Sequence, residues 1–152
     1  MFHGQLVGIY TTAESASPVR RVESVEARAG EGLVGDRYGT LLPGGNPDQE
    51  ITLIESEALE AALREYQVEL APHEARRNLV TRGVPLNHLV GRTFRVGDVN
   101  IRGLRLCEPC GHLEKLTRVG VRKALVHRGG LRAQILRGGT LRVGDVIEPL
   151  AE

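Results

Sequence analysis

The chain has 152 residues and a nearly balanced charge, with 20 Lys and Arg against 19 Asp and Glu. This length fits one domain that buries a core without disulfides or metals. A hydrophobic fraction of 41% excludes a disordered chain, and the net charge of +1 argues against a dedicated nucleic-acid-binding protein. No apolar run reaches the roughly 20 residues of a membrane-spanning helix, and the N-terminus is not typical of a secretion signal. We therefore expect a cytoplasmic protein with no nucleic-acid or membrane partner.

The first half of the chain alternates predicted strands with one clear helix. Strands are predicted over residues 5–12, 19–28 and 51–54. The stretch 29–50 between the last two has six glycines and two prolines, and a loop of that length is typical of a functional segment. Residues 55–66 carry Ala and Leu at helical spacing and predict a helix. A second, short helix is predicted over 72–79, opened by Pro72.

Two near-copies dominate the second half of the chain. Residues 91–103 and 138–150 share the pentapeptide RVGDV, offset by 47 residues, and each predicts a hairpin around a Gly-Asp turn. Another strand is predicted over 131–136, and short helices are predicted within CEPCGHLEKL and VGVRKALVHRGG. Two copies are too few for a solenoid, whereas paired hairpins can close a small barrel. We therefore predict a mainly β fold, a small closed β-barrel with peripheral helices, in a single domain of residues 1–152.

The two cysteines, Cys107 and Cys110, stand together as CEPC after a predicted strand. One pair is not the disulfide framework of a small secreted domain, so we expect reduced thiols. A cysteine at the start of a helix can be reactive, because the helix dipole and nearby cations stabilise its thiolate. Arg102, Arg105 and Lys115 are close in sequence and can supply this charge. Packing of both cysteines as small buried hydrophobes is the alternative, and their spacing does not decide between the two.

More specific kinds of CxxC site find less support. Structural zinc needs four ligands, and the pair with His112 supplies three, so zinc is not expected. Covalent haem attachment needs CxxCH, but Gly111 separates Cys110 from the histidine. A thioredoxin-type pair follows the first strand of a βαβ unit, whereas this pair lies among predicted hairpins. A thiol redox protein therefore stays an alternative with weak support.

Two other segments offer groups that bind anions. In GLVGDRYG the glycines permit close backbone approach and Arg37 can hold an anion bidentately; the alternative is that Asp36 and Arg37 brace the loop. The glycine spacing matches neither a P-loop nor a dinucleotide-binding fingerprint. ARRNLVTRG is a basic cluster in a nearly neutral protein, in which Arg76 and Asn78 can point the same way from an extended segment and hold a phosphate. A solvated surface cluster is the alternative there.

Together these segments resemble the MOSC domain family, named for the C-terminal domain of molybdenum cofactor sulfurases. The matching segments are GLVGDRYG, QEITLIESEALEA, RRNLVTRGVPLNHLVGRTFRVGDV, LCEPCGHLEKL and GGLRAQILRGGTLRVGDV, which cover nearly the whole chain. The resemblance implies a β-barrel related to the barrel domain of pyruvate kinase. It also implies a cysteine that carries sulfur as a persulfide for metal–sulfur cluster synthesis, or that ligates the molybdenum of the cofactor.

The resemblance also assigns roles to particular residues. The family's cysteine matches Cys110, as persulfide carrier or molybdenum ligand, because it precedes the short apolar segment HLEKL, and Cys107 is an auxiliary companion. In relatives that hold the cofactor, an Arg-x-Asn segment grips the phosphate side of the pterin, and RRN matches it. The residues implied to bind the cofactor, molybdopterin, are Arg37, Gln49, Arg76 and Asn78.

Additional domains of larger relatives do not fit into 152 residues. Cofactor sulfurases carry a pyridoxal-phosphate cysteine desulfurase, and no pyridoxal phosphate site is readable here, so a cysteine desulfurase or another sulfur donor is the expected partner. Amidoxime-reducing relatives carry an additional N-terminal β-barrel domain. We therefore expect a sulfur-carrier or molybdenum-cofactor-binding module. The alternatives are a molybdenum-dependent reductase of N-hydroxylated compounds fed by a separate redox protein, a CxxC thiol redox protein, and a scaffold whose cysteines are merely packed.

Overall fold

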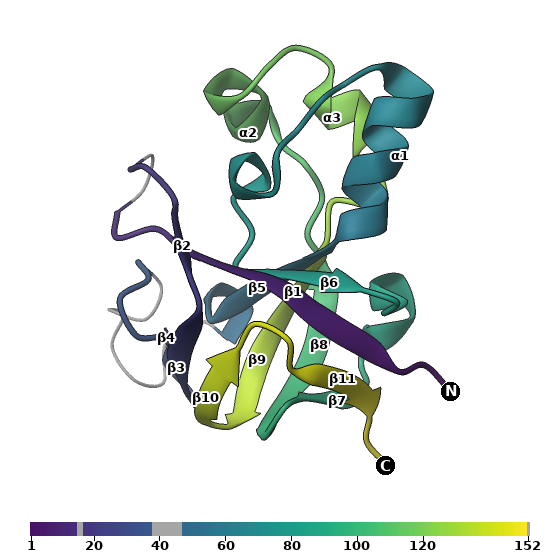
Figure 1. Cartoon of the computed structure of the whole chain (residues 1–152). Coiled ribbons are helices and arrows are strands. Elements are labelled where there is room, and N and C mark those ends of the chain that lie inside the picture. The colour runs from purple at the N-terminus through teal and green to yellow at the C-terminus, as the bar shows by residue number, and fades with distance from the viewer. Residues whose placement is uncertain (15–16, 38–46, 152) are drawn as a thin grey trace.

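The computed structural model describes residues 1–14, 17–37 and 47–151, and strands make up most of its regular structure (Figure 1). The strands are β1 (Gly4–Thr11), β2 (Arg20–Val22), β3 (Ser24–Arg28), β4 (Gly32–Leu33), β5 (Ile51–Glu55), β6 (Leu79–Arg82), β7 (Thr93–Val96), β8 (Val99–Leu106), β9 (Leu131–Arg137), β10 (Gly139–Arg142) and β11 (Val146–Pro149). The helices are α1 (Ser56–Tyr66), α2 (Gly111–Leu116) and α3 (Val121–Ala124), with single 3₁₀ turns η2 (Pro47–Gln49), η3 (Pro72–Ala75) and η4 (Leu86–Leu89).

Seven of these strands form a closed barrel. The strand order is β11-β7-β8-β9-β5-β6-β1, and β11 pairs with β1 to close the ring. β2 extends the sheet beside β1, while β10, β3 and β4 form a separate small sheet. The predicted fold class, a small closed β-barrel with helices outside it, is therefore confirmed.

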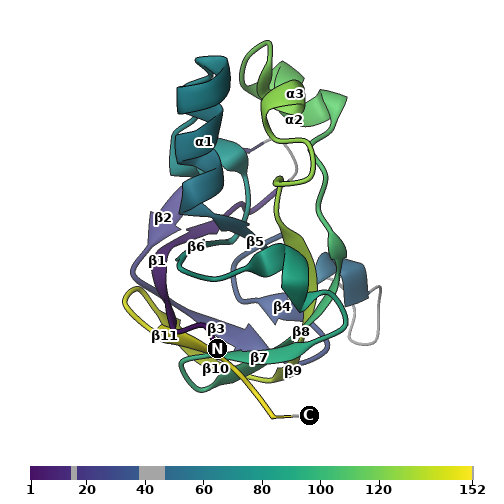
Figure 2. The same cartoon turned by 90° about the vertical axis from the view of Figure 1, so that its right-hand side faces the viewer.

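Side-chain alternation along the strands divides the core into two parts. Leu53 and Leu79 belong to the cluster that fills the barrel, whereas their neighbours Ile54 and Val80 belong to a second cluster that also contains buried residues of the helices. Because successive strand residues point to opposite faces, β5 and β6 each contribute to both clusters. The three α-helices lie together at one end of the barrel, and the two chain ends lie away from them (Figures 1 and 2).

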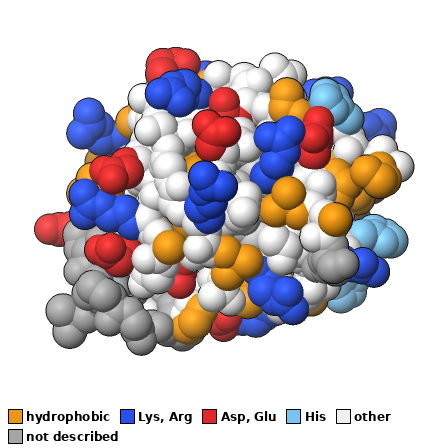
Figure 3. Space-filling view, turned by 90° about the horizontal axis from the view of Figure 1, so that it is seen from below, with side chains coloured by type: hydrophobic (Ala, Val, Ile, Leu, Met, Phe, Trp, Pro, Cys, Tyr) orange, Lys and Arg blue, Asp and Glu red, His pale blue; other side chains and the backbone are white. Residues whose placement is uncertain are grey.

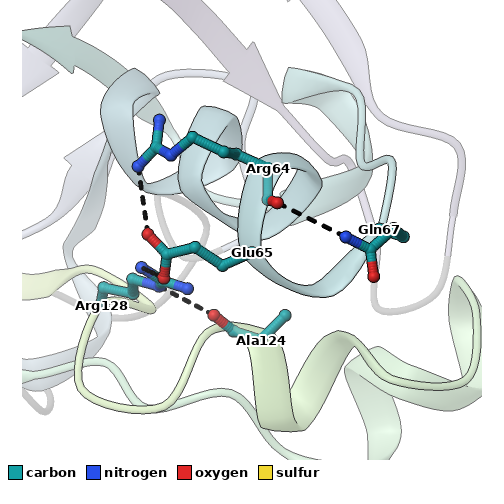
Figure 4. Close-up of polar contacts among 5 residues, drawn as sticks. All are labelled: Arg64, Glu65, Gln67, Ala124 and Arg128. Atoms are coloured by element: carbon teal, nitrogen blue, oxygen red, sulfur yellow. Dashed lines mark hydrogen bonds and ion pairs between the residues drawn. The ribbon is translucent and has the colours of Figure 1, made fainter.

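Helix α1 forms as its amphipathic pattern predicts and docks on the segment around α3. Its first turns bury Ala58 and Leu59. At its last turn the Arg128 guanidinium donates through Nε to the Ala124 carbonyl at 2.8 Å and through Nη1 to the Glu65 carboxylate at 3.1 Å (Figure 4). These contacts join the end of α1 to α3 and the segment that follows it.

One predicted strand is in fact two. Over residues 19–28, β2 pairs with β1, whereas β3 pairs with β10 in the other sheet. The chain changes partner at Glu23, whose carbonyl accepts a hydrogen bond from the Val143 amide at 3.0 Å. Two polar residues, Glu23 and Ser24, stand between Val22 and Val25, so the apolar–polar alternation changes phase where the chain changes sheets. Farther along, residues 38–46 of the predicted glycine-rich loop lie outside the described part of the chain.

Only one of the two predicted hairpins forms. The RVGDV of residues 95–99 joins β7 to β8, which pair directly, but β10 pairs with β3 and β11 with β7 and β1. The second hairpin prediction is therefore wrong. The two copies instead pack on each other, since the Gly97 amide donates to the Val146 carbonyl at 2.9 Å. Gly97 has φ +56°, and a Cβ there would lie 2.6 Å from the Asp145 carboxylate, so the contact requires glycine.

The face of the barrel away from the helices carries charges of both signs, with acidic, basic and apolar side chains interspersed (Figure 3). No helix among the described residues is both long enough and apolar enough to cross a membrane.

Thr81 offers a test of packing inside the barrel. It is fully buried on the same strand face as Leu79, and its hydroxyl is the only buried side-chain oxygen or nitrogen without a hydrogen-bond partner among the described residues. Thr81→Val keeps the shape and removes this oxygen, so we expect the free energy of unfolding to rise by about 1 kcal/mol in urea denaturation. The matched control is Thr52→Val, because the Thr52 hydroxyl accepts a hydrogen bond from the Asn78 amide at 3.0 Å. Thr52→Val should lower stability, and an equal loss in both variants would contradict the prediction.

Candidate functional site

Two adjacent pockets, which share five lining residues, lie at the helical end of the barrel. The inner pocket has a cavity volume of ≈ 40 Å³ and the outer one ≈ 220 Å³. Both are lined by Arg37, Arg76, Arg77, Cys107 and Arg132. Asn78 lines the inner pocket, and Cys110 and His112 line the outer one. Of the six residues predicted from the sequence, the structure thus brings five together at one site, and Gln49 lines neither pocket.

Arg37 is positioned by a loop that is bonded to the end of β1. The Arg37 amide donates to the Thr12 carbonyl at 2.7 Å, and the Thr12 amide donates to the Asp36 carboxylate at 2.9 Å. Asp36 is almost fully buried. Asp36 therefore braces the loop, which was the alternative considered for this segment, while Arg37 lines the pocket.

The segment before β6 turns two arginines toward the pockets. The helix predicted over 72–79 is wrong, because η3 ends at Ala75 and Arg76 has a left-handed backbone with φ +56°. The chain then enters β6, which pairs in parallel with β5. The Arg76 guanidinium donates through Nη2 to the Ser17 carbonyl at 2.9 Å.

The arginines of the site are held by carbonyl oxygens. Arg77 donates to the carbonyls of Gly129 at 2.9 Å and Cys107 at 3.2 Å, and Arg132 donates to the Asp48 carbonyl at 3.1 Å. Within the described part of the chain, no ion pair includes Arg76, Arg77 or Arg132. A carbonyl fixes a guanidinium without neutralising it, so the positive charge of this wall remains available to an anion.

The electrostatics of Arg76 agree with a positively charged wall. Burial and the neighbouring Arg37 both lower the pKa of the Arg76 guanidinium. Each of these effects disfavours a cation, and a bound anion would offset both. The geometry and the pKa therefore point to the same property, a pocket that favours negatively charged ligands.

Asn78 is used by the fold itself. Its side-chain oxygen accepts hydrogen bonds from the Thr52 amide at 3.0 Å and the Thr52 hydroxyl at 3.2 Å, and its Nδ2 donates to the Tyr10 carbonyl at 3.1 Å. The residue is 6% exposed. These bonds connect β1, β5 and the start of β6 beneath the arginines. Contact of Asn78 with a ligand stays a prediction.

The two thiols differ in their surroundings. Cys107 is 3% exposed and follows β8, with its amide donating to the Gly130 carbonyl at 2.7 Å. Cys110 is exposed, has an extended backbone and immediately precedes α2. Between them the Glu108 carboxylate accepts hydrogen bonds from the His127 amide at 2.7 Å and faces its Nδ1 at 2.8 Å. The cysteine loop is thereby attached to the segment after α3.

The charge near the thiols does not come from the residues expected from sequence proximity. Arg102, Arg105 and Lys115 line neither pocket, and Arg105 pairs with the Asp48 carboxylate at 2.7 Å. The pocket arginines supply the charge instead. No motif in the sequence marks Arg132, because it lies in the ordinary strand pattern of β9, far along the chain from most of the other site residues. No group of three or more His, Cys, Asp or Glu suited to a metal ion is found in the described ranges.

Glu50, next to Gln49, is a buried carboxylate that the sequence did not reveal. It is 5% exposed and accepts a hydrogen bond from the Ile135 amide at 2.9 Å. Burial raises the pKa of Glu50 above its usual 4.5. The folded state therefore binds this proton more tightly than the unfolded state does, and the associated stability is lost as the pH rises from 4.5 through the folded pKa.

Glu50→Gln removes this titration, so we expect a flatter dependence of the free energy of unfolding on pH above 4.5. Glu65→Gln is the control of opposite sign, because hydrogen bonds from Arg128 and Arg64 lower the pKa of Glu65. In that variant the stability gained on raising the pH should shrink. Urea denaturation at a series of pH values from about 4 to 8 measures the free energy of unfolding of the two variants and of the unmodified chain. Identical profiles for Glu50→Gln and the unmodified chain would refute the prediction.

Comparison with known proteins identifies the family. A model of the MOSC domain matches residues 42–148, more than half of the chain. Among solved structures, the YUAD protein from Bacillus subtilis has a TM-score of 0.77 at 15% identity, covering 97% of both chains. YiiM from Escherichia coli has a TM-score of 0.72 at 19% identity, and the match covers 100% of this chain and 71% of that chain. YiiM from Geobacillus stearothermophilus has a TM-score of 0.73 at 16% identity, and the match covers 97% of this chain and 75% of that chain. No functionally curated protein matched. The structural likeness shows the barrel fold, and the match to the family model shows that this chain belongs to the MOSC domain family.

Proposed function

We propose that this chain is a molybdenum-cofactor-binding and sulfur-carrying module. In this proposal the arginine pocket binds the phosphate of the pterin, and the Cys110 thiolate ligates the metal or carries a persulfide sulfur. The observation that carries the proposal is the juxtaposition of Cys110 with Arg37, Arg76 and Arg132 around one pocket. The MOSC family's association with the cofactor supports it.

The donor set fits the chemistry of the cofactor. A phosphate needs planar, charged donors. Arg76 and Arg132 line this pocket and make no ion pair among the described residues, since each is held by a backbone carbonyl. A molybdenum–dithiolene centre is soft and accepts thiolate ligands, which Cys110 can provide. When bound, the cofactor supplies a redox-active metal.

The sizes of the two pockets indicate which end of the cofactor each one would hold. The inner cavity of ≈ 40 Å³ has room for about three waters, comparable to a phosphate group but too small for a pterin. The outer cavity of ≈ 220 Å³ can hold a larger group beside Cys110. We therefore place the phosphate toward the inner pocket, where Arg76 and Arg132 bind its oxygens, and the sulfur chemistry toward the outer pocket.

The test is the molybdenum and pterin content of the protein after expression in a host that makes the cofactor. We expect the unmodified chain to retain both, Cys110→Ser to lose them, and Cys107→Ser to lose less. Cys107→Ser is the matched control, because it makes the same atomic change at the buried thiol of the same pocket. Equal loss in both variants would overturn the assignment of Cys110. Absence of cofactor from all three proteins would refute cofactor binding.

The exposure of Cys110 favours persulfide carriage as the second form of this function. A sulfur donor, such as a cysteine desulfurase in the cytoplasm, has to reach the acceptor thiol, and an exposed thiol permits that contact. Mass spectrometry after incubation with a persulfide donor would show a gain of one sulfur atom on Cys110. A reductase of N-hydroxylated compounds would additionally need an electron-donating redox protein. Turnover of a hydroxylamine by the metal-loaded protein distinguishes that activity.

A further inference from the structure

The second cysteine of the site, Cys107, is buried, and the proposed function gives it no role of its own. Cys107 lines both pockets, whereas Cys110 lines the outer one alone. The outer pocket therefore has two thiols on its wall, one 3% exposed and one exposed. An exposed thiol is reached from solvent, whereas the buried one is reached through the pocket.

Several contacts hold Cys107 in place. Its amide donates to the Gly130 carbonyl at 2.7 Å, and its carbonyl accepts from Arg77 Nη2 at 3.2 Å. Gly129 packs so closely that a Cβ there would lie 2.6 Å from the Cys107 carbonyl oxygen. The Cys110 side chain makes no capping hydrogen bond to α2. One thiol of the pair is therefore fixed by its backbone, while the other stands at the exposed end of the same loop.

We propose that Cys107 is the resolving thiol that discharges a persulfide from Cys110 as hydrosulfide. This inference rests on the persulfide form of the proposed function. The Cys107 thiolate attacks the Sγ of Cys110, a Cys107–Cys110 disulfide forms, and the bond between that Sγ and the outer sulfur breaks. The outer sulfur leaves as HS⁻ with the electron pair of the broken bond. The outer sulfur is reduced to sulfide, the Cys107 sulfur is oxidised, the Cys110 sulfur keeps its oxidation level, and no other reactant enters the step.

The loading and recovery steps balance in the same way. Cys110 thiolate takes the outer sulfur of a persulfide donor, R–S–SH, and releases R–S⁻. After discharge, a dithiol reductant reduces the disulfide to two thiols and becomes a cyclic disulfide. Two residues separate Cys107 from Cys110, which is the spacing found in known dithiol–disulfide pairs.

The arginine wall suits this step because the attacking thiolate and the departing hydrosulfide are both anions. Arg77 and Arg132 line both pockets with Cys107, so their charge lies beside the attacking thiolate and along the route of the departing hydrosulfide. A cationic, partly enclosed site stabilises thiolates and small anions. The inner cavity of ≈ 40 Å³ is large enough for a hydrosulfide ion.

The experiment uses the reduced full chain and one equivalent of glutathione persulfide under anaerobic conditions, without a dithiol. Released hydrosulfide is measured over time, and alkylation followed by mass spectrometry identifies the protein species. We expect the unmodified chain to release hydrosulfide and to end as the Cys107–Cys110 disulfide. Cys107→Ser should keep the sulfur on Cys110 and release hydrosulfide at least about tenfold more slowly than the unmodified chain does. Cys110→Ser should take up no sulfur.

The outcomes separate this inference from the function on which it rests. If the unmodified chain takes up no sulfur, persulfide carriage itself fails. If it holds the persulfide as long as Cys107→Ser does, or if the sulfur moves to Cys107, carriage stands and the resolving role is overturned. Cys107→Ala replaces Cys107→Ser if circular dichroism shows that the serine variant is unfolded. As an independent measurement, the thiol oxidant diamide should convert the unmodified chain to the intrachain disulfide, and persistence of both alkylatable thiols would also overturn the proposal.

Discussion

Asn78→Ala is expected to lower the free energy of unfolding by about 3 kcal/mol. Asn78 is 6% exposed, and its side chain makes three hydrogen bonds, to the Thr52 amide, the Thr52 hydroxyl and the Tyr10 carbonyl. The substitution leaves buried partners unsatisfied, and each such group costs about 1–3 kcal/mol. The loss should be large because the three bonds join strands that are distant in sequence.

Urea denaturation measures this loss, and Asn87→Ala is the matched control. Asn87 is exposed, and its Nδ2 donates to the His127 carbonyl at 2.7 Å. Water can replace that bond after truncation, so we expect a loss below about 1 kcal/mol. If Asn78→Ala is as stable as Asn87→Ala and fails to bind phosphate, Asn78 is a ligand-binding residue, as the family resemblance implies, and its structural role is secondary.

Arg76→Ala is expected to weaken binding of pyrophosphate at least about tenfold with a small change in stability. A charge-assisted hydrogen bond contributes about 1.5–3 kcal/mol, which corresponds to roughly 10- to 100-fold in affinity. The fold uses Arg76 for one hydrogen bond, to the Ser17 carbonyl at 2.9 Å. Removing the Arg76 side chain also relieves its charge repulsion with Arg37, which offsets little of the loss because the pocket loses a charged hydrogen-bond donor.

Isothermal titration with pyrophosphate tests this prediction without the complete cofactor. Arg102→Ala is the control, because Arg102 is an exposed arginine that lines neither pocket. Its loss changes the net charge equally, so a general electrostatic effect would weaken binding in both variants alike. Unchanged affinity in Arg76→Ala would show that Arg76 does not bind the anion, and a large fall in melting temperature would make Arg76 structural.

Local patterns located much of this fold. The strands predicted at β1, β5 and β9 and the helical spacing in α1 each correspond to an element of the structure. The patterns did not predict where a strand ends or which strand it pairs with, because both depend on strands that are distant in the sequence. The chain changes sheets at Glu23, and the second RVGDV copy pairs with other strands instead of folding on itself. Both copies have the same five residues, so their different pairing has no local signal.

The candidate site divides in the same way. Motifs pointed to Arg37, Arg76 and both cysteines, because each lies in a segment of unusual composition. Arg132 carries no such signal and enters the site because β9 pairs with both β5 and β8 at the helical end of the barrel.

The sequence by itself determined a mainly β fold of the MOSC type, and its motifs pointed to five of the residues that line the two pockets. Only the tertiary structure decided which of them share a pocket, that Asn78 holds strands together, and that Cys107 is buried while Cys110 is exposed. The physical reason is that propensity and alternation act between near neighbours in the chain. The pockets, in contrast, form where the ends of five separate strands meet, and that meeting depends on pairing across the closed barrel.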